Sequence, residues 1–281
     1  MTVHIEGTVR GIYGNVPPED VVGHLKREKS ILAWAIDGAS TLTESPFTTF
    51  SHVTDAGWFA RRLSGALEAT FKDQSFCKSE LAKMLSCIRD EYRIASKNVQ
   101  PIWAWPVAAA IILEIDLASA PTIELTAYRY ADCFWGFHQD LIQRPHAIEP
   151  SLKAIDDTYD VWKPCSGFCG EHLERLRSRR RQQQRNELST ALTVNPVSAT
   201  NASAETYTID SPMQIMLGTD GLSRIWERYD LMTQAVAIQL ASSQGLSTLI
   251  DVLRDAEAHL QTRRDGEKRR DDASGILISI G

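Results

Sequence analysis

The sequence predicts a one-domain α/β (α+β) protein, and three observations support this fold class. The chain has 281 residues, 43% of them hydrophobic, which is enough for a sizeable buried core. Apolar strand-like runs alternate with segments in which apolar residues recur every three to four positions. We find neither an internal repeat nor a clear linker, and we therefore expect residues 1–281 to form a single domain.

The expected elements can be justified in chain order from their apolar spacing and from the turn residues between them. We predict strands over residues 3–11, 30–37, 105–116, 122–132, 211–221 and 273–280. We predict helices over residues 55–71, 79–98, 171–192, 231–243 and 246–263. The turn LASAP joins the third and fourth of these strands as an antiparallel pair, and the pattern is loosest in the region of about 140–210.

Charge and targeting signals exclude several classes of partner. The formal net charge is −6, so we expect no bulk attraction to nucleic acid or to an anionic membrane. The N-terminus has no secretory pattern and no apolar run is long enough to span a bilayer, which predicts a cytoplasmic protein. Five cysteines fit a reducing compartment. A zinc site at Cys165, Cys169 and His172 matches no standard spacing, so ordinary thiols are favoured.

Several apolar runs have an aspartate at one end. Asp37 ends ILAWAID, Asp132 ends LTAYRYAD, Asp220 ends MQIMLGTD, and Asp271 precedes ASGILISI. Strand ends lie along one edge of a sheet, so these carboxylates can converge, and oxygen ligands suit Mg²⁺ or Mn²⁺. The alternative for each aspartate taken singly is a tight turn or a helix cap.

These segments together resemble the metal-dependent serine/threonine phosphatases of the protein phosphatase 2C family. The matching stretches are ILAWAIDGAS, WPVAAAIILEID, ELTAYRYADCFWGF, MQIMLGTDGLSRIWERYDL and RRDDASGILISI, and they extend from about residue 5 to residue 281. TDGL before an aromatic-bearing helix and DDAS before the last strand are the most specific parts. The resemblance implies a divergent bacterial-type member with a four-layer α-β-β-α sandwich of two central antiparallel sheets.

The same resemblance implies two metal sites, with a weaker third. Asp37 would bridge two Mg²⁺ or Mn²⁺ ions, and the carbonyl of Gly38 would bind one of them. Asp220 and Asp271 would ligate the first site. Asp132 would belong to the possible third metal.

The N-terminal acidic pair of the family corresponds to Glu19-Asp20, which implies Asp20 as a further metal ligand. Asp272 stands where the family often has Asn or Asp. The nearest match to a substrate-binding arginine is Arg10, although it lies ten residues before Asp20 and a surface arginine on a first strand is the alternative.

The implied activity is hydrolysis of phosphoserine or phosphothreonine in a protein by a metal-bridging water, without a covalent phosphoenzyme. Asp37 and Asp220 would be the catalytic aspartates. Ala39 and Ser40 replace family glycines after Asp37, and Ala131 precedes Asp132 where the family has glycine. These departures favour an alternative, a catalytically weak phosphatase fold that acts as a regulatory or phosphoprotein-binding module.

An arginine-rich segment, ERLRSRRRQQQR, occupies residues 174–185. As a helix it would carry arginines around much of its circumference, and no aromatic residues interleave as base-stacking platforms. A solvated helix is one interpretation, and nucleic-acid binding is another that the composition does not favour. In the family, a variable flap near the active site is inserted in the region of about 140–210, so we hypothesise that these arginines attract an acidic phosphoprotein substrate. The sequence does not predict the oligomeric state.

Overall fold

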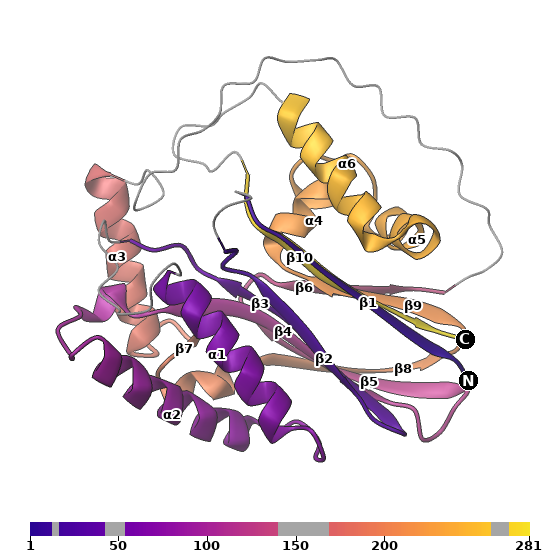
Figure 1. Ribbon diagram of the computed structural model, residues 1–281, viewed down its shortest axis with the longest axis horizontal. Helices are drawn as coiled ribbons and strands as arrows, with labels where there is room; N and C mark the ends of the chain where they lie inside the picture. The colour runs from indigo at the N-terminus through magenta and orange to yellow at the C-terminus, as the bar shows by residue number, and fades with distance from the viewer. Residues whose placement is uncertain (13–16, 43–53, 140–168, 260–269) are drawn as a thin grey trace.

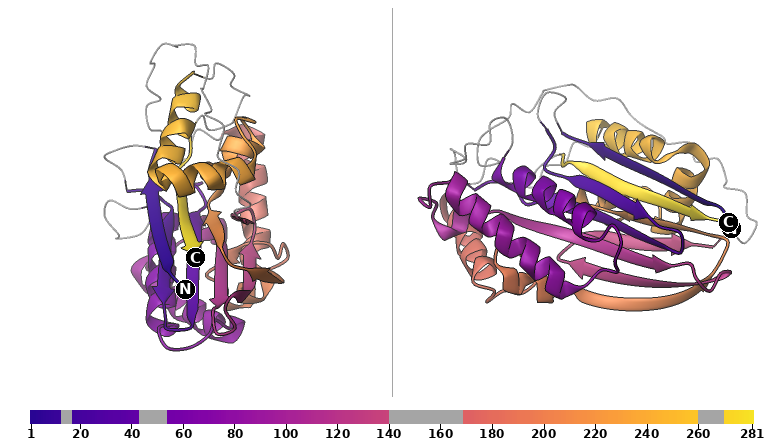
Figure 2. Two further views of the ribbon diagram at one scale, coloured as in Figure 1. Left: turned by 90° about the vertical axis from the view of Figure 1, so that its right-hand side faces the viewer. Right: turned by 60° about the horizontal axis from the view of Figure 1, so that its bottom comes forward.

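A computed structural model describes residues 1–12, 17–42, 54–139, 169–259 and 270–281. Two antiparallel β-sheets pack face to face, and each carries helices on its outer side (Figure 1, Figure 2). The layers therefore follow the order helix, sheet, sheet, helix. This arrangement confirms the α-β-β-α sandwich with two central antiparallel sheets.

The smaller sheet has four strands in the order β1-β10-β9-β6. Their bounds are Val3–Arg10 for β1, Phe134–His138 for β6, Met213–Gly218 for β9 and Ala273–Ile280 for β10. The first and last strands of the chain are thus direct neighbours, and both termini lie at the same end of the molecule (Figure 1).

The larger sheet has six strands, with β2-β3-β4-β5-β8 in order and a short β7 paired to β4. Their bounds are Val21–Lys26 for β2, Ser30–Gly38 for β3, Val107–Asp116 for β4, Thr122–Tyr130 for β5, Leu192–Thr193 for β7 and Ser203–Asp210 for β8. The turn after β4 joins it to β5 as the antiparallel pair that the sequence predicts.

The helices form two groups, one on the outer face of each sheet, and a further helix, Gly170–Gln184, lies apart from both. Their bounds are Asp55–Thr70 for α1, Lys78–Ala95 for α2, Gly170–Gln184 for α3, Asp220–Glu227 for α4, Gln234–Gln244 for α5 and Leu246–His259 for α6. Two 3₁₀ helices cover Ile102–Ala104 and Pro196–Asn201. Helices α1 and α2 cover the larger sheet, and α4 to α6 cover the smaller one (Figure 1).

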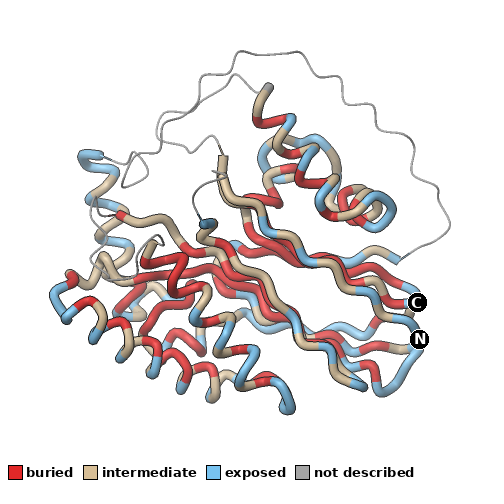
Figure 3. The backbone as a smooth tube through the Cα atoms, viewed as in Figure 1, coloured by how far each residue is buried: buried red, intermediate tan, exposed pale blue. Residues whose placement is uncertain are grey.

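The continuous apolar run of β3 is buried on both faces. Ile31, Ala33 and Ala35 pack between the two sheets. Leu32, Trp34 and Ile36 alternate with them and pack against α1 and α2. A strand with helices on one side and a second sheet on the other has no solvent face, which is why it carries no polar alternation. The burial is visible as the red central strands in Figure 3.

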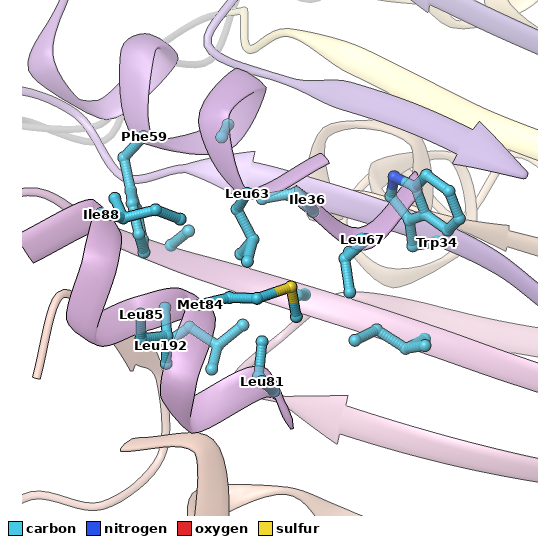
Figure 4. Packing of buried hydrophobic residues seen from close by; sticks show 14 of the residues in the cluster. Trp34, Ile36, Phe59, Leu63, Leu67, Leu81, Met84, Leu85, Ile88 and Leu192 are labelled. Atoms are coloured by element: carbon cyan, nitrogen blue, oxygen red, sulfur yellow. The ribbon is translucent and has the colours of Figure 1, made fainter. Parts of the chain in front are cut away.

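The layer between the larger sheet and its helices is closely packed. Phe59, Leu63 and Leu67 lie along α1 and meet the side chains of β3 (Figure 4). The indole N–H of Trp34, although buried, donates to Ser64 Oγ at 2.8 Å, so the polar atom keeps a partner. The outer helices thus hold β3 in place, and with it the aspartate at its end.

Four of the described strands were not predicted. Strand β2 is short and half-polar, β6 has only five residues, and β8 is exposed at all but one position. Strand β7 has two residues, and its Leu192 was predicted as the end of a helix that in the structure ends at Gln184. An edge strand rich in Ser and Thr buries too little apolar surface to show a strand pattern. Within the described residues, no helix is both long and apolar enough to cross a bilayer.

Candidate functional site

Both sheets bring aspartates to a common end of the sandwich. Antiparallel pairing of β2 with β3 places Asp20, just before β2, beside Asp37, at the end of β3. Antiparallel pairing of β9 with β10 likewise places Asp220, which begins α4, beside Asp271, just before β10. The four carboxyl groups interact with one another electrostatically. Residues that lie far apart in the sequence therefore form one acidic cluster.

Asp20 connects the two sheets. It is only 2% exposed, and its Oδ2 accepts hydrogen bonds from Thr219 Oγ1 at 2.7 Å and Ser274 Oγ at 2.8 Å. Burial, followed by the charge of Asp272, raises the pKa of Asp20 to about 8 against the lowering effect of the two hydroxyls. Both hydroxyls bind the same oxygen, which leaves Oδ1 available to a ligand.

The carboxyl groups of Asp37 and Asp220 lie in contact, which adds to the rise that burial causes in the pKa of Asp37 and partly opposes the rise that burial causes in the pKa of Asp220. Burial raises the pKa of Asp37 well above its ordinary value, and the charges of Asp20 and Asp220 add to this. Burial also raises the pKa of Asp220, followed by the charge of Asp271. Carboxyl groups whose charges raise one another's pKa in this way are typical of a site with surplus negative charge.

Asp271 is bound by two arginines through different atoms. Arg224 Nη2 donates to its Oδ2 at 2.7 Å, and Arg254 Nη2 donates to its backbone carbonyl at 2.7 Å. Arg254 also pairs with the buried Glu257 at 2.7 Å. This network fixes the chain immediately before β10.

Asp272 holds the N-terminal acidic pair in place. Its Oδ1 accepts a hydrogen bond from the Ile12 N–H at 2.9 Å, and its Oδ2 accepts one from the Glu19 N–H at 2.6 Å. Glu19 Oε1 in turn accepts a hydrogen bond from Thr54 Oγ1 at 2.6 Å. Asp272 therefore acts on the backbone that carries Asp20 and positions it.

Two glycines allow close backbone approach at the cluster. A Cβ on Gly221 would lie 1.8 Å from the carbonyl oxygen of Asp272, and one on Gly38 would lie 2.9 Å from the carbonyls of Ala56 and Glu19. The glycines that follow Asp37 and Asp220 are therefore required by packing, independently of any role of the aspartates.

Asp132 lies at the rim of the cluster. It is exposed, follows β5 by two residues, and its charge acts on Asp220. The preceding residue, Ala131, has a φ of 60°, the left-handed conformation that glycine adopts without strain. The neighbouring Cys133 is buried, and burial raises the pKa of its thiol well above the ordinary value. That thiol is not a nucleophile of the kind that a lowered pKa produces.

No protein-family model and no curated protein matches the sequence. Solved structures do match the fold. The serine/threonine phosphatase Stp1 from Staphylococcus aureus aligns with a TM-score of 0.54 and 9% identity, over 100% of this chain and 96% of that one. The Mycobacterium tuberculosis phosphatase PstP/Ppp aligns with a TM-score of 0.53 and 14% identity, over 100% and 99%. This chain has the fold of the bacterial serine/threonine phosphatases.

Two further structures with this phosphatase fold were determined with metals. The PstP catalytic domain in complex with two manganese ions aligns with a TM-score of 0.52 and 12% identity, over 99% of this chain and 97% of that one. RsbX in complex with magnesium aligns with a TM-score of 0.50 and 11% identity, over 99% and 96%. The resemblance to protein phosphatase 2C in the sequence is therefore confirmed at the level of the fold.

The acidic cluster of this phosphatase fold suits a hard divalent cation in donor chemistry. Its candidate ligands are carboxylate and carbonyl oxygens, and three of its carboxyl groups have raised pKa values because buried negative charge accumulates there. In the part of the chain that the structure describes, no three His, Cys, Asp or Glu side chains already converge as a ligand set. The residue types fit the metal, and binding would require some carboxylates to turn.

Arg10 is placed differently from the other predicted site residues. Its Nη1 pairs with Asp251 on α6, and its side chain is 39% exposed. The structure brings Arg10 to this outer pair, whereas Asp20, Asp37, Asp220 and Asp271 form the cluster.

Helix α3 contributes a residue that sequence reasoning did not single out. Arg180 Nη2 donates to the Ser40 carbonyl at 3.2 Å, and Glu19 and Asp37 lie close enough to stabilise its charge. The sequence signal was present, because residues 174–185 carry six arginines, but their even distribution around the helix does not indicate which one faces the cluster. Of the residues that the sequence offered for the disfavoured zinc site, Cys165 lies outside the described part of the chain.

Proposed function

We propose that the protein is a metal-dependent phosphatase that hydrolyses phosphoserine or phosphothreonine in a phosphoprotein. The observation that carries this proposal is the acidic cluster at one end of a phosphatase-type sandwich, in which burial and neighbouring carboxylates raise the pKa values of Asp20, Asp37 and Asp220. Such a concentration of carboxylates needs positive charge to ionise fully, and two Mg²⁺ or Mn²⁺ ions would supply it.

Each residue of the cluster has a distinct role in this proposal. Asp37 and the carbonyl of Gly38, together with Asp20, Asp220 and Asp271, would hold the two ions. Asp132 at the rim would serve a third. When bound, the ions would acidify the attacking water and neutralise charge on the phosphoryl oxygens.

The surrounding residues keep these ligands oriented. The hydroxyls of Thr219 and Ser274 hold Asp20 by one oxygen, and Asp272 fixes the backbone of Glu19. The thiol of Cys133 takes no part, because burial raises its pKa. We therefore propose direct hydrolysis without a covalent phosphoenzyme.

The partner that we propose is an acidic phosphoprotein in the cytoplasm. Exposed arginines on α3, among them Arg175 and Arg179, would attract its negative charge over distances of up to a Debye length. One structure with the same fold, aligned over 99% of this chain with 10% identity, concerns the bacterial stressosome and secondary messenger signalling. A signalling phosphoprotein is accordingly the substrate class that we favour.

The test is Mn²⁺-dependent hydrolysis of p-nitrophenyl phosphate and of a phosphoserine peptide by the purified chain. Asp37→Asn and Asp220→Asn should each lower kcat/KM by at least about 100-fold, the range expected when one charge-stabilising group is lost. Asp73→Asn, an exposed aspartate outside the cluster, is the matched control and should keep full activity. A wild-type protein that is inactive with Mn²⁺, or variants equal to the control, would refute the enzymatic proposal.

A second candidate function is a catalytically weak, phosphoprotein-binding regulatory module. The ion pair of Asp271 with Arg224 favours it, because this carboxylate must exchange a guanidinium for a metal. The replacement of family glycines by Ala39 and Ser40 after Asp37 points the same way. Specific binding of a phosphoserine peptide without Mn²⁺-dependent turnover would establish this alternative.

A further inference from the structure

Helix α3 lies over the loop that follows Asp37. Arg180 Nη2 donates to the Ser40 carbonyl at 3.2 Å, and one turn earlier Arg177 Nη2 donates to the Leu42 carbonyl at 3.4 Å. Arg177 also stacks on the Trp103 ring, with its guanidinium carbon 4.3 Å from the ring centroid. Two arginines of one helix thus hold the same loop, and only Arg180 reaches the acidic cluster.

Arg180 is half-buried and lies close to two carboxylates. Burial lowers its pKa to about 10, while Glu19 and Asp37 favour its charged form. The guanidinium therefore remains protonated at neutral pH. Among the described residues its one hydrogen-bond acceptor is the Ser40 carbonyl, and a guanidinium has five donors in a planar fork. Donors remain for a ligand beside Asp37.

The other arginines near the cluster are engaged with protein acceptors. Arg61 donates to the carbonyls of Gly57 and Pro18. Arg224 pairs with Asp271 at 2.7 Å, and Arg10 pairs with Asp251. The charges of Arg224 and Arg10 are therefore paired with aspartates, although Arg224 Nη1 has no hydrogen-bond partner among the described residues, and Arg61 uses two of its donors to hold backbone carbonyls.

We infer that Arg180 binds the phosphoryl oxygens of the substrate beside Asp37, a role for which the sequence had offered Arg10. This inference rests on the proposed function and deepens it by naming the residue that selects a phosphate group. A phosphoryl group carries several acceptor oxygens, and a guanidinium matches two of them at once. The Ser40 carbonyl holds one end of the guanidinium, and the charges of Glu19 and Asp37 favour its position beside the cluster.

The test measures binding as well as turnover, using the full chain loaded with Mn²⁺. Inorganic phosphate binding is measured by calorimetry, and KM and kcat are measured with a phosphoserine peptide. Arg180→Gln should weaken phosphate binding and raise KM by about 10-fold or more, the scale of a lost charge-assisted hydrogen bond. Arg180→Lys keeps the positive charge but loses the planar guanidinium. Its phosphate affinity and its KM should lie between those of Arg180→Gln and wild type.

Two controls separate phosphate binding from other effects of the substitution. Arg177→Gln removes the other arginine that holds the loop after Asp37, and Arg62→Gln removes an exposed arginine that pairs with Glu91 on α2 outside the cluster. Both should stay within about 2-fold of wild type in phosphate affinity, because neither reaches the cluster. If Arg177→Gln and Arg180→Gln weaken binding equally, Arg180 acts only by holding the loop and the inference fails.

The failures of the two proposals can be told apart. Active wild-type enzyme with unchanged phosphate affinity in Arg180→Gln would overturn the role of Arg180 and leave the phosphatase proposal standing. A wild-type protein without turnover that binds phosphate or phosphopeptide through Arg180 would uphold the inference and refute the phosphatase. Absence of any phosphate or phosphopeptide binding by the wild type would overturn the inference.

Discussion

Arg224 Nη2 donates to Asp271 Oδ2 at 2.7 Å, with the two side chains only 12% and 23% exposed. The guanidinium also acts on Asp220, where it partly opposes the rise in pKa that burial and the charge of Asp271 cause. A fixed positive charge therefore stands at two of the carboxylates that we propose as metal ligands. A divalent cation at the same carboxylates has to compete with it.

Removing this guanidinium should tighten metal binding. We expect Arg224→Gln to lower the Mn²⁺ dissociation constant by about 3-fold to 10-fold, because a competing charge and its repulsion of the metal are lost. Calorimetric titration of Mn²⁺ into the chelator-treated protein measures this directly. Arg62→Gln removes an arginine whose partner, Glu91, lies on α2 outside the cluster, and it should leave the affinity unchanged. Weaker Mn²⁺ binding in Arg224→Gln would instead show that the arginine orients Asp271 as a ligand.

We predict that the stability of the protein depends on both carboxylate oxygens of Asp272, because each accepts a backbone hydrogen bond. In Asp272→Asn one carboxylate oxygen is replaced by an NH₂ group. That group cannot accept the hydrogen bond from the backbone N–H of Ile12 or of Glu19. We expect a loss of about 1–3 kcal/mol in the free energy of unfolding, the cost of an unsatisfied buried group. Asp251→Asn removes an exposed ion pair with Arg10 and should change the free energy of unfolding by less than about 0.5 kcal/mol. Urea unfolding of both variants is the measurement, and equal stabilities would contradict the role of Asp272.

Gly221 should tolerate no side chain. A Cβ there would lie 1.8 Å from the Asp272 carbonyl, so Gly221→Ala must displace backbone next to Asp271 and Asp220. We expect a loss of at least about 2 kcal/mol in stability together with weaker Mn²⁺ binding. Gly65→Ala on α1 meets nothing within 4 Å and should instead stabilise the protein by about 0.5–1 kcal/mol. Thermal unfolding compares the two, and a neutral Gly221→Ala would contradict the predicted clash.

The sequence predicts those parts of the fold whose signal is local. The run ILAWAI has no polar residue because β3 is buried on both faces, and the Asp-Gly that follows marks where the strand reaches the cluster. Strand β8 shows no such signal, because an exposed edge strand is built from Ser, Thr and Glu and is defined by its pairing with β5. Non-local pairing of this kind leaves little trace in a short window of sequence.

The acidic members of the candidate site could be predicted because strand ends carry them, whereas its arginines could not. Arg224 follows the TDGL motif by two residues and Arg180 is one of six arginines in a polar segment. Only the packing of α3 over the loop at Ser40, and of α4 beside Asp271, decides which guanidinium meets a carboxylate. Hydrophobic periodicity identifies the apolar face of a helix, but it does not show which of several polar side chains points toward a site.

The stability of the metal-free protein should depend on pH through Asp20. The folded-state pKa of Asp20 is about 8, raised by burial, whereas an unfolded aspartate has its model value of 3.8. Between these values the folded chain retains a proton that the unfolded chain has lost, so the unfolding free energy falls as pH rises. The loss of unfolding free energy caused by Asp20 is absent below about pH 4 and complete above about pH 8.

Asp20→Asn removes this titration while its amide oxygen can still accept from Thr219 and Ser274. In the presence of a chelator, the variant should therefore gain stability relative to wild type as pH rises from 5 to 8, by at most about 1.4 kcal/mol per pH unit. Urea unfolding at several pH values measures the difference, and titrations common to both proteins cancel. A difference that stays constant or shrinks with pH would show that Asp20 ionises normally. With saturating Mn²⁺ the order should reverse, since metal binding stabilises the wild type through the carboxylate that the variant lacks.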